Sequence, residues 1–403
     1  MSETMTFSDL RSRGFLSFGD GYRTKKSEHG RPGIPILRVA EVLDGVIRPE
    51  LKDFVLLDFR AAMGNKTSKQ GDVVLTTKGT VGRVAVIPDS FPEFVYSPQL
   101  CYFRVKSGSP ISWRYLYYWF KSTEFWNQAM RSKSQTDMAD YLNLADISSL
   151  KITIPDQRHQ KAVTDVLGAL DDKIAVNDRI VAKSRELGLI LYSAALRNGR
   201  SENREVGSLV SELTRGIAPK YSESTDDLLV LNQKCVRDGR VGLSAARRTL
   251  PGKVKAAKHL RRNDVLVNST GVGTLGRVAR WTRDIEATVD SHVTIVRFDA
   301  TRVDPVCAGF AMLRAQRDIE LLGEGSTGQT ELRRAQLGEL MIELPSREQQ
   351  NRLRSELDAL ETRSEQAIVE SRTLAALRDT LLPQLMSGRL RVQDAEKLVE
   401  DAA

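Results

Sequence analysis

Apolar positions along the chain follow two kinds of pattern, and each kind occurs twice. Short runs rich in β-branched residues and bounded by glycine are typical of β-strands, as in "VVLTT" from Val73 and "RVAVIP" from Arg83. After Pro155, and again after Pro345, apolar or small residues are spaced alternately four and three apart, which predicts a long amphipathic helix. Strands and turns followed by a long helix, twice over, predict an α+β fold.

The two helical patterns carry matching apolar stripes. The predicted seam residues are Leu167, Leu170, Ile174, Val181 and Leu191 in the first helix and Leu353, Leu357, Leu360, Leu374 and Leu381 in the second. Small or polar residues occupy matching central places, and only Arg378 interrupts the second stripe. The match predicts two antiparallel helices packed as a coiled-coil spacer, each about 60 Å long. Each pattern stops at a glycine, Gly199 or Gly388.

The strand-rich segments are copies of one another. "GDVVLTTKGTVGRVAV" from Gly71 returns as "NDVLVNSTGVGTLGRVAR" from Asn263, with two extra residues in the second turn. "GIPILRVAEVLDG" aligns with "DLLVLNQKCVRDG" at a shift of 227 − 33 = 194, and each ends in an Asp-Gly turn. "ITIPDQRHQ" aligns with "IELPSREQQ" at a shift of 342 − 152 = 190. The chain is therefore a tandem duplication in which each copy has its own core, with the two copies in a pseudo-twofold arrangement.

These patterns predict the domain organisation. Globular domains are expected at 1–155 and 200–345, each followed by a helical region, at 156–199 and 346–390, with a tail at 391–403.

An aromatic-rich stretch, "SWRYLYYWFKSTEFWNQAM", predicts one helix with Trp113, Leu116, Phe120 and Trp126 broadly on one side. Base stacking is one interpretation of such a stripe, and packing in the core is the one we favour.

Composition agrees with a globular protein. The 403 residues are 41% hydrophobic and 28% charged, an ordinary balance for a soluble chain. No apolar run approaches the roughly 18 residues of a membrane helix, and the N-terminal residues lack the pattern of a signal peptide. Cys101, Cys235 and Cys307 are widely spaced, which indicates a reducing, cytoplasmic setting without membrane attachment.

The chain has a net charge of +8, and its basic residues cluster in "RTKKSEHGR" and "KVKAAKHLRR". The second cluster contains Lys255 and Lys258. A basic cluster can bind nucleic acid, and it can equally be a solvated face, so charge alone leaves both interpretations open.

Catalytic patterns are missing from the sequence. There is no GxxxxGK[ST] phosphate loop and no NPPY methyltransferase tetrapeptide, and the four histidines lack metal-ligand spacing. A nuclease-like trio of Asp44, Glu50 and Lys52 can be chosen, but the pattern is permissive and has no counterpart in the second copy. The chain is predicted to bind without catalysing.

Together these features resemble the specificity subunit of type I restriction–modification enzymes. The resemblance rests on the GIPILRVAEVLDG strand, the glycine turn ending in Gly-Arg in both copies, and the proline and glutamine that open each long helix, at Pro155/Gln160 and Pro345/Gln350. The terminal "LLPQLMSGRL" is also similar to the family. In the second copy, "DLL" replaces the "GIP" of the first.

The resemblance implies two target-recognition domains, each specific for one half-site of an interrupted sequence in double-stranded DNA. The helices would set the gap and dock two methyltransferase subunits, with restriction/translocase subunits added for cleavage. S-adenosylmethionine, ATP and magnesium would belong to those partners, with no cofactor in this chain.

Candidate DNA contacts lie in the glycine turns, where the backbone can approach a phosphate or a base edge. They are Thr76, Thr77, Lys78, Thr80 and Arg83 in the first copy and Asn268, Ser269, Thr270, Thr274 and Arg277 in the second, with Lys255 and Lys258 from the basic cluster. Residues identical in both copies are expected to be scaffold or phosphate contacts, and those that differ are expected to read bases.

Three other functions remain open at this point. The chain could be a self-sufficient nuclease or methyltransferase, the recognition chain of a different methylation or restriction system, or a coiled-coil adaptor that does not bind DNA.

Overall fold

The computed structural model describes residues 3–48, 50–89, 91–131, 141–323 and 331–400. It divides into two compact units, the first formed by residues 1–175 with 371–403 and the second by residues 176–370. The boundaries of these units fall inside the two long helices, α6 (Gln157–Arg197) and α11 (Arg347–Met386). Each unit therefore contains one globular head and parts of both helices.

The head of the first unit is built on an antiparallel sheet in the order β2-β8-β5-β6 and a smaller sheet in the order β4-β3-β7. The terminal strand β1 pairs with β9, which leads into α6. The strands are β1 (Glu3–Thr6), β2 (Leu16–Asp20), β3 (Gly33–Leu37), β4 (Phe54–Leu56), β5 (Val73–Thr76), β6 (Val84–Val86), β7 (Val95–Tyr96), β8 (Leu100–Val105) and β9 (Lys151–Ile154). The helices are α1 (Phe7–Ser12), α2 (Arg60–Met63), α3 (Trp113–Lys121), α4 (Thr123–Arg131) and α5 (Leu144–Ser149).

The head of the second unit repeats this plan. Its main sheet, β11-β20-β17-β18, has the order of β2-β8-β5-β6, and β10 pairs with β21 as β1 does with β9. The main sheet consists of β11 (Val210–Arg215), β17 (Val265–Asn268), β18 (Val278–Arg280) and β20 (Val293–Phe298), and the separate pair consists of β10 (Ser201–Glu205) and β21 (Met341–Pro345). The helices are α7 (Val206–Leu209), α8 (Pro305–Arg314), α9 (Gln316–Leu321) and α10 (Arg334–Glu339). The shared order confirms the predicted duplication.

The second sheet of this head has the order β12-β16-β13-β19, and a short hairpin, β14-β15, accompanies it. These strands are β12 (Tyr221–Ser222), β13 (Leu228–Leu231), β14 (Val236–Arg237), β15 (Arg240–Val241), β16 (Arg247–Thr249) and β19 (Ala287–Val289). Asp238 and Gly239 form the hairpin turn with φ of 51° and 70°, which is the geometry that an Asp-Gly pair favours.

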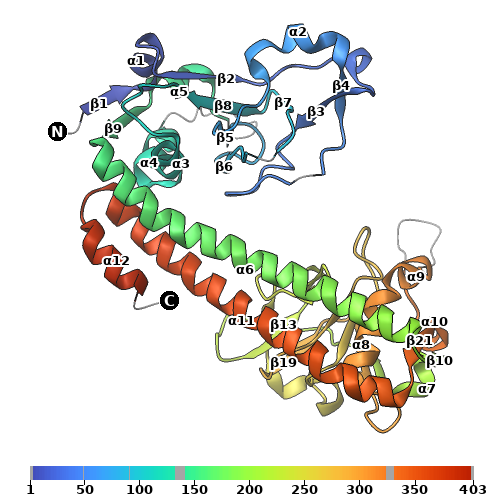
Figure 1. Cartoon of the computed structure of the whole chain (residues 1–403). Coiled ribbons are helices and arrows are strands. Elements are labelled where there is room, and N and C mark those ends of the chain that lie inside the picture. The colour runs from blue at the N-terminus through green and yellow to red at the C-terminus, as the bar shows by residue number, and fades with distance from the viewer. Residues whose placement is uncertain (1–2, 49, 90, 132–140, 324–330, 401–403) are drawn as a thin grey trace. The chain divides into compact units, whose positions relative to one another are not determined.

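The long helices α6 and α11 pack antiparallel, as predicted (Figure 1). Within the second unit, Asn177 Nδ2 donates to Glu370 at 2.8 Å, whereas Gly188, 11 residues further along α6, faces Leu357. Most predicted seam residues are buried, and Ile174, Leu191 and Leu360 are half-buried. Arg378, which interrupts the stripe, bonds Asp171 at 2.7 Å in the first unit.

Each head packs on the helix that follows it and on the end of the other helix. The first core joins strands and aromatic helices to Val163 and Leu167 of α6 and to Leu381 and Leu385 of α11. The second core contains Tyr192 and Leu196 of α6 with Leu353 and Leu357 of α11. The short final helix, α12 (Val392–Glu400), buries Ala395 in the first core.

The aromatic-rich stretch forms two helices, so the prediction of one helix was wrong. Ser122 adopts an extended backbone (ψ 159°), and its hydroxyl accepts the N–H of Phe125 at 3.3 Å, which starts α4. The favoured interpretation of core packing is confirmed for Leu116 and Phe120, which are fully buried, while Trp113 and Trp126 remain partly exposed.

Three further observations concern cysteines, membranes and metals. Cys101, Cys235 and Cys307 are buried and form no disulfide, and burial raises the pKa of all three thiols. Within the described residues, none of the helices has the length and apolar content needed to cross a bilayer. In the same part of the chain, no three His, Cys, Asp or Glu side chains gather as metal ligands.

Candidate nucleic-acid interface

The aspartate repeated before each glycine turn is a buried anchor. In the first head, the carboxylate of Asp72 accepts Nε and Nη2 of Arg104, on β8, at 2.7 and 2.6 Å. It also accepts the N–H of Lys69 and the hydroxyl of Tyr96. Burial by itself would lower the pKa of Arg104, but the hydrogen bonds and charge of Asp72 raise it. A bidentate ion pair of this kind fixes the position of the strand that leads into the turn.

The second head contains the same anchor. Asp264 accepts Nε and Nη2 of Arg297, on β20, at 2.8 and 2.7 Å, and the N–H of Arg261 at 2.8 Å. Both arginines also donate to a backbone carbonyl, Arg104 to Thr67 and Arg297 to His259. The repetition of this aspartate in the sequence therefore has a structural cause.

The glycine turns that follow β5 and β17 depend on left-handed backbone. Gly82 has φ of +96° and Gly276 has φ of +80°. A Cβ at Gly82 would collide with the ring of Trp126, and one at Gly276 would collide with the backbone of Glu320. Glycine is required at both positions because a helix of the head, α4 or α9, presses directly on the turn.

Four of the predicted DNA contacts are buried in the turns. Thr76 Oγ1 accepts the N–H of Arg83 at 2.9 Å and lies 2.5 Å from the carbonyl of Thr80. The other three are held in the same way: Thr77 donates to Gln99 O, Asn268 donates to Gln233 O and Thr274 O, and Ser269 pairs with Thr294. The polar side-chain atoms of Thr76, Thr77 and Ser269 already hold the turn, so we expect these three residues not to read bases. Oδ1 of Asn268 is buried without a partner among the described residues, and base reading by Asn268 stays a prediction.

The remaining turn residues reach the surface. Lys78 and Thr80 are exposed, and Thr270 and Thr274 are half-buried. Thr270 Oγ1 lies 2.7 Å from Nδ1 of His292. Their contact with DNA stays a prediction.

The two turn arginines are half-buried and each makes a backbone contact. Arg83 donates from Nη1 to Val42 O at 3.3 Å, and Arg277 donates from Nη2 to Gly273 O at 2.8 Å. A guanidinium has five N–H donors, so each keeps donors for a phosphate or a guanine.

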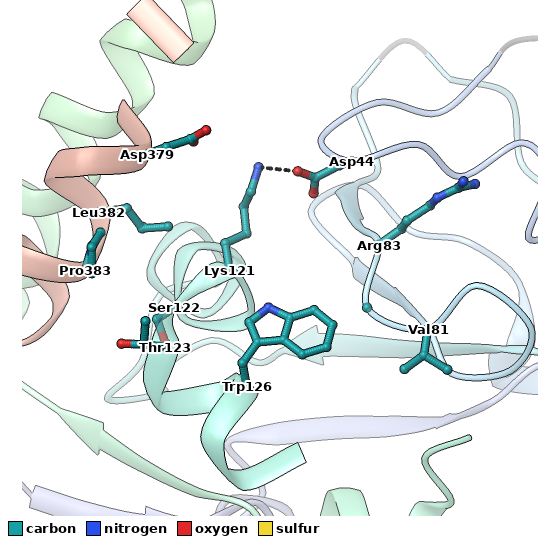
Figure 2. Close-up of a pocket in the computed structure, with 11 residues that line it drawn as sticks. Asp44, Val81, Arg83, Lys121, Ser122, Thr123, Trp126, Asp379, Leu382 and Pro383 are labelled. Carbon is teal, nitrogen blue, oxygen red and sulfur yellow. Dashed lines mark ion pairs between the residues drawn. The ribbon is translucent and has the colours of Figure 1, made fainter. Parts of the chain in front are cut away.

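A pocket of about 400 Å³ lies beside the first turn (Figure 2). Lys121 forms an ion pair with Asp44 at 3.1 Å across its mouth. The lining contains two cations, Arg83 and Lys121, and two carboxylates, Asp44 and Asp379. Because these charges balance, the pocket does not favour an anion. Its lining shows instead that the turn lies beside α4 and the end of α11.

The glutamines that open the long helices are structural. Gln160 Oε1 accepts the N–H of Ser112, the N-cap of α3, at 2.9 Å, and Gln350 Oε1 accepts the N–H of Asp304, the N-cap of α8, also at 2.9 Å. Each Nε2 donates to the carbonyl of the preceding proline at 2.8 Å. The repeated Pro and Gln thus join each long helix to its own head.

Lys255 is exposed, and Lys258 lines a groove with three arginines that the sequence analysis missed, Arg215, Arg333 and Arg334. A difference between the copies could have pointed to these arginines: Arg333-Arg334 stands where the first copy has Asn143-Leu144, at the same shift of 190.

Comparisons with known proteins agree with this geometry. Residues 14–183 match the family described as "Type I restriction modification DNA specificity domain". The S subunit of a type I restriction–modification system from M. genitalium shares 14% identity, with 96% of each chain covered and a TM-score of 0.57. The HsdS subunit from Thermoanaerobacter tengcongensis also shares 14% identity, over 96% of this chain and 97% of the other, with a TM-score of 0.37. No curated protein sequence matches. The first structure shows that the fold is shared over nearly the whole chain.

Proposed function

Because residues 14–183 match the family described as type I restriction modification DNA specificity domain, we propose that the chain selects the DNA target of such a complex. In this role it performs no chemistry itself. The observation that carries the proposal is the repeat of one scaffold with different surface residues. Both heads hold a glycine turn on the same buried Asp–Arg anchor, at Asp72 and Asp264.

Each head then recognises one half-site of an interrupted DNA sequence. The two turns differ at one surface position: Lys78, which is exposed in the first head, corresponds to Thr270, which is half-buried in the second, whereas Thr80 and Thr274 are both threonine. The second turn is also two residues longer, since 277 − 264 = 13 and 83 − 72 = 11. Different side chains on equivalent scaffolds are what two different half-sites require. The helices α6 and α11 set the gap between the half-sites.

The catalytic steps belong to partner subunits. In this proposal the helices dock two methyltransferase subunits, and restriction/translocase subunits join for cleavage. S-adenosylmethionine, ATP and magnesium bind those partners, and the complex acts on DNA in the cytoplasm.

The test is a map of methylated bases across the genome of a host with this gene intact and with it deleted. Deletion is expected to abolish methylation at one split motif, with two short specified segments around a fixed gap. The variant Lys78→Thr is expected to alter one segment only, and Arg13→Gln, at an exposed ion pair with Glu3 outside the two long helices, is the control that leaves both segments unchanged. If the chain co-purifies with an active methyltransferase and its loss changes no motif, the proposal fails.

Cleavage of DNA by the purified chain alone would instead support a self-sufficient nuclease. Absence of salt-sensitive DNA binding by the assembled complex would support the coiled-coil adaptor.

A further inference from the structure

The second head carries a basic groove beside its glycine turn. Arg215, at the end of β11, lines this groove of about 510 Å³ together with Lys258, Arg333 and Arg334. Among the described residues, the carboxylate in the lining is that of Glu331, which forms an ion pair with Arg215 at 2.7 Å. Even with Arg333 left out of the count, three cations, Arg215, Lys258 and Arg334, stand against this carboxylate.

The groove is continuous with the turn. Thr270, in the turn, pairs through its backbone with Glu331, and Leu332 donates its N–H to Ser269 O at 2.8 Å. The basic side chains therefore flank the surface that is proposed to meet the DNA.

Two of the cations are held in place by the fold. Arg215 Nη2 donates to Leu332 O at 2.8 Å, and Lys258 Nζ donates to Gly216 O at 2.8 Å. A cation fixed before the ligand arrives loses little side-chain entropy when it binds.

In the first head, the position that corresponds to the groove has the same backbone but not the same charge. Lys66 Nζ donates to Gly21 O at 2.8 Å, as Lys258 does to Gly216 O, which fixes the correspondence between the heads. At the end of β2, Asp20 occupies the position of Arg215, and it bonds Lys66 at 3.2 Å. The remaining counterparts are Tyr141, Asn143 and Leu144. Among these counterparts in the described part of the chain, one cation and one carboxylate balance each other.

We propose that this groove binds the phosphate backbone of DNA next to the half-site of the second head, and that the first head makes no equivalent contact. The inference rests on the proposed function, since a duplex must already lie against the turn. Phosphate is the ligand because the site is open, polar and cationic, and arginine forks match phosphate oxygens.

The quantity to measure is the salt dependence of binding. Each phosphate neutralised on duplex DNA contributes a slope of about −0.9 to log K against log salt. In the complex assembled with the full-length chain, the variant Arg334→Gln is expected to flatten the slope by about one unit on a 30-base-pair duplex of unrelated sequence. Arg334→Lys keeps the charge and is expected to keep most of the slope.

A matched pair of lysines separates charge from structure. Lys258→Gln and Lys66→Gln each remove a lysine that bonds an equivalent glycine carbonyl, and thermal melting of both checks that they fold. Only Lys258→Gln is expected to flatten the slope, by about one unit.

The outcomes are distinct. If the glutamine variants retain the slope of the unaltered chain, the groove does not bind phosphate and the inference is overturned, while the proposed function stands. An equal loss for Lys66→Gln and Lys258→Gln would overturn the asymmetry between the heads. If the complex assembled with the unaltered chain shows no salt-dependent binding to any duplex, the proposed function fails and the inference fails with it.

Discussion

Replacing Asp264 by asparagine tests whether the buried anchor holds the second head together. The side chain is 1% exposed and accepts three hydrogen bonds, two of them from the guanidinium of Arg297, which is itself buried. Asparagine fills the same space but has no charge, and its amide N–H₂ faces N–H groups that the carboxylate accepted. It therefore leaves Arg297 without a counter-ion in the interior.

Breaking one partner of a buried ion pair costs about 3–5 kcal/mol. For a unit of about 195 residues, each kcal/mol lowers the melting temperature by about 2–4 °C. The expected shift is then roughly 6–20 °C, confined to the second unit. Differential scanning calorimetry of the full chain measures it.

A double variant shows whether the loss of stability comes from the unpaired charge of Arg297. Asp264→Leu/Arg297→Met removes both charges, and a buried pair replaced by apolar side chains is often neutral or stabilising. It is expected to melt well above the single variant. Arg352→Gln, at an exposed pair on α11, is the control and costs at most about 1 kcal/mol. If Asp264→Asn melts within a degree or two of the unaltered chain, the buried pair does not stabilise the second head. A double variant that is no more stable than the single variant would refute the same reasoning.

Three other predictions concern the scaffold. Gln350→Ala leaves the N–H of Asp304 buried without its acceptor and is expected to cost about 1–3 kcal/mol in urea unfolding; an unchanged midpoint would contradict it. Gly82→Ala is expected to destabilise the fold more than Gly79→Ala, because both glycines have left-handed φ but only Gly82 has a ring against it; equal costs would remove the role of that contact. Thr77→Val is expected to lower stability by about 1 kcal/mol and leave the methylated motif unchanged; a changed motif would restore it as a base reader.

Features set by local periodicity could be predicted from the sequence. The heptad stripe that contains Leu167 and Leu357 gave the two long helices, 41 and 40 residues long, because spacing along a helix fixes which residues share a face. The Asp-Gly turn at Asp238 and the strand pattern at Val73 depend only on neighbouring residues, and both formed where expected. The break at Ser122 was missed because one serine among aromatic residues weakens a helical pattern only slightly.

Features set by distant contacts could not be predicted. Thr77 and Asn268 have the side chains of base readers, but their partners, Gln99 and Gln233, lie 22 and 35 residues away. Only the folded structure therefore shows that the hydroxyl of Thr77 and Nδ2 of Asn268 already donate hydrogen bonds. The basic groove combines residues as far apart as Arg215 and Arg334, which no single segment of sequence displays.

The duplication itself separates scaffold from specificity. At Asp72 and Asp264, which both heads keep, the side chain is buried and its partners are the same type of group. Where the heads differ at a solvent-facing site on a common backbone, as at Asp20 and Arg215, the change alters the charge that DNA would meet and leaves the pairing of the strands intact. Stability requires the shared residues in both copies, whereas the asymmetric DNA target proposed for this chain would require the others to differ. The shared buried side chains at Asp72 and Asp264 hold the turns, and under this proposal differing exposed positions are where the two half-sites would be told apart.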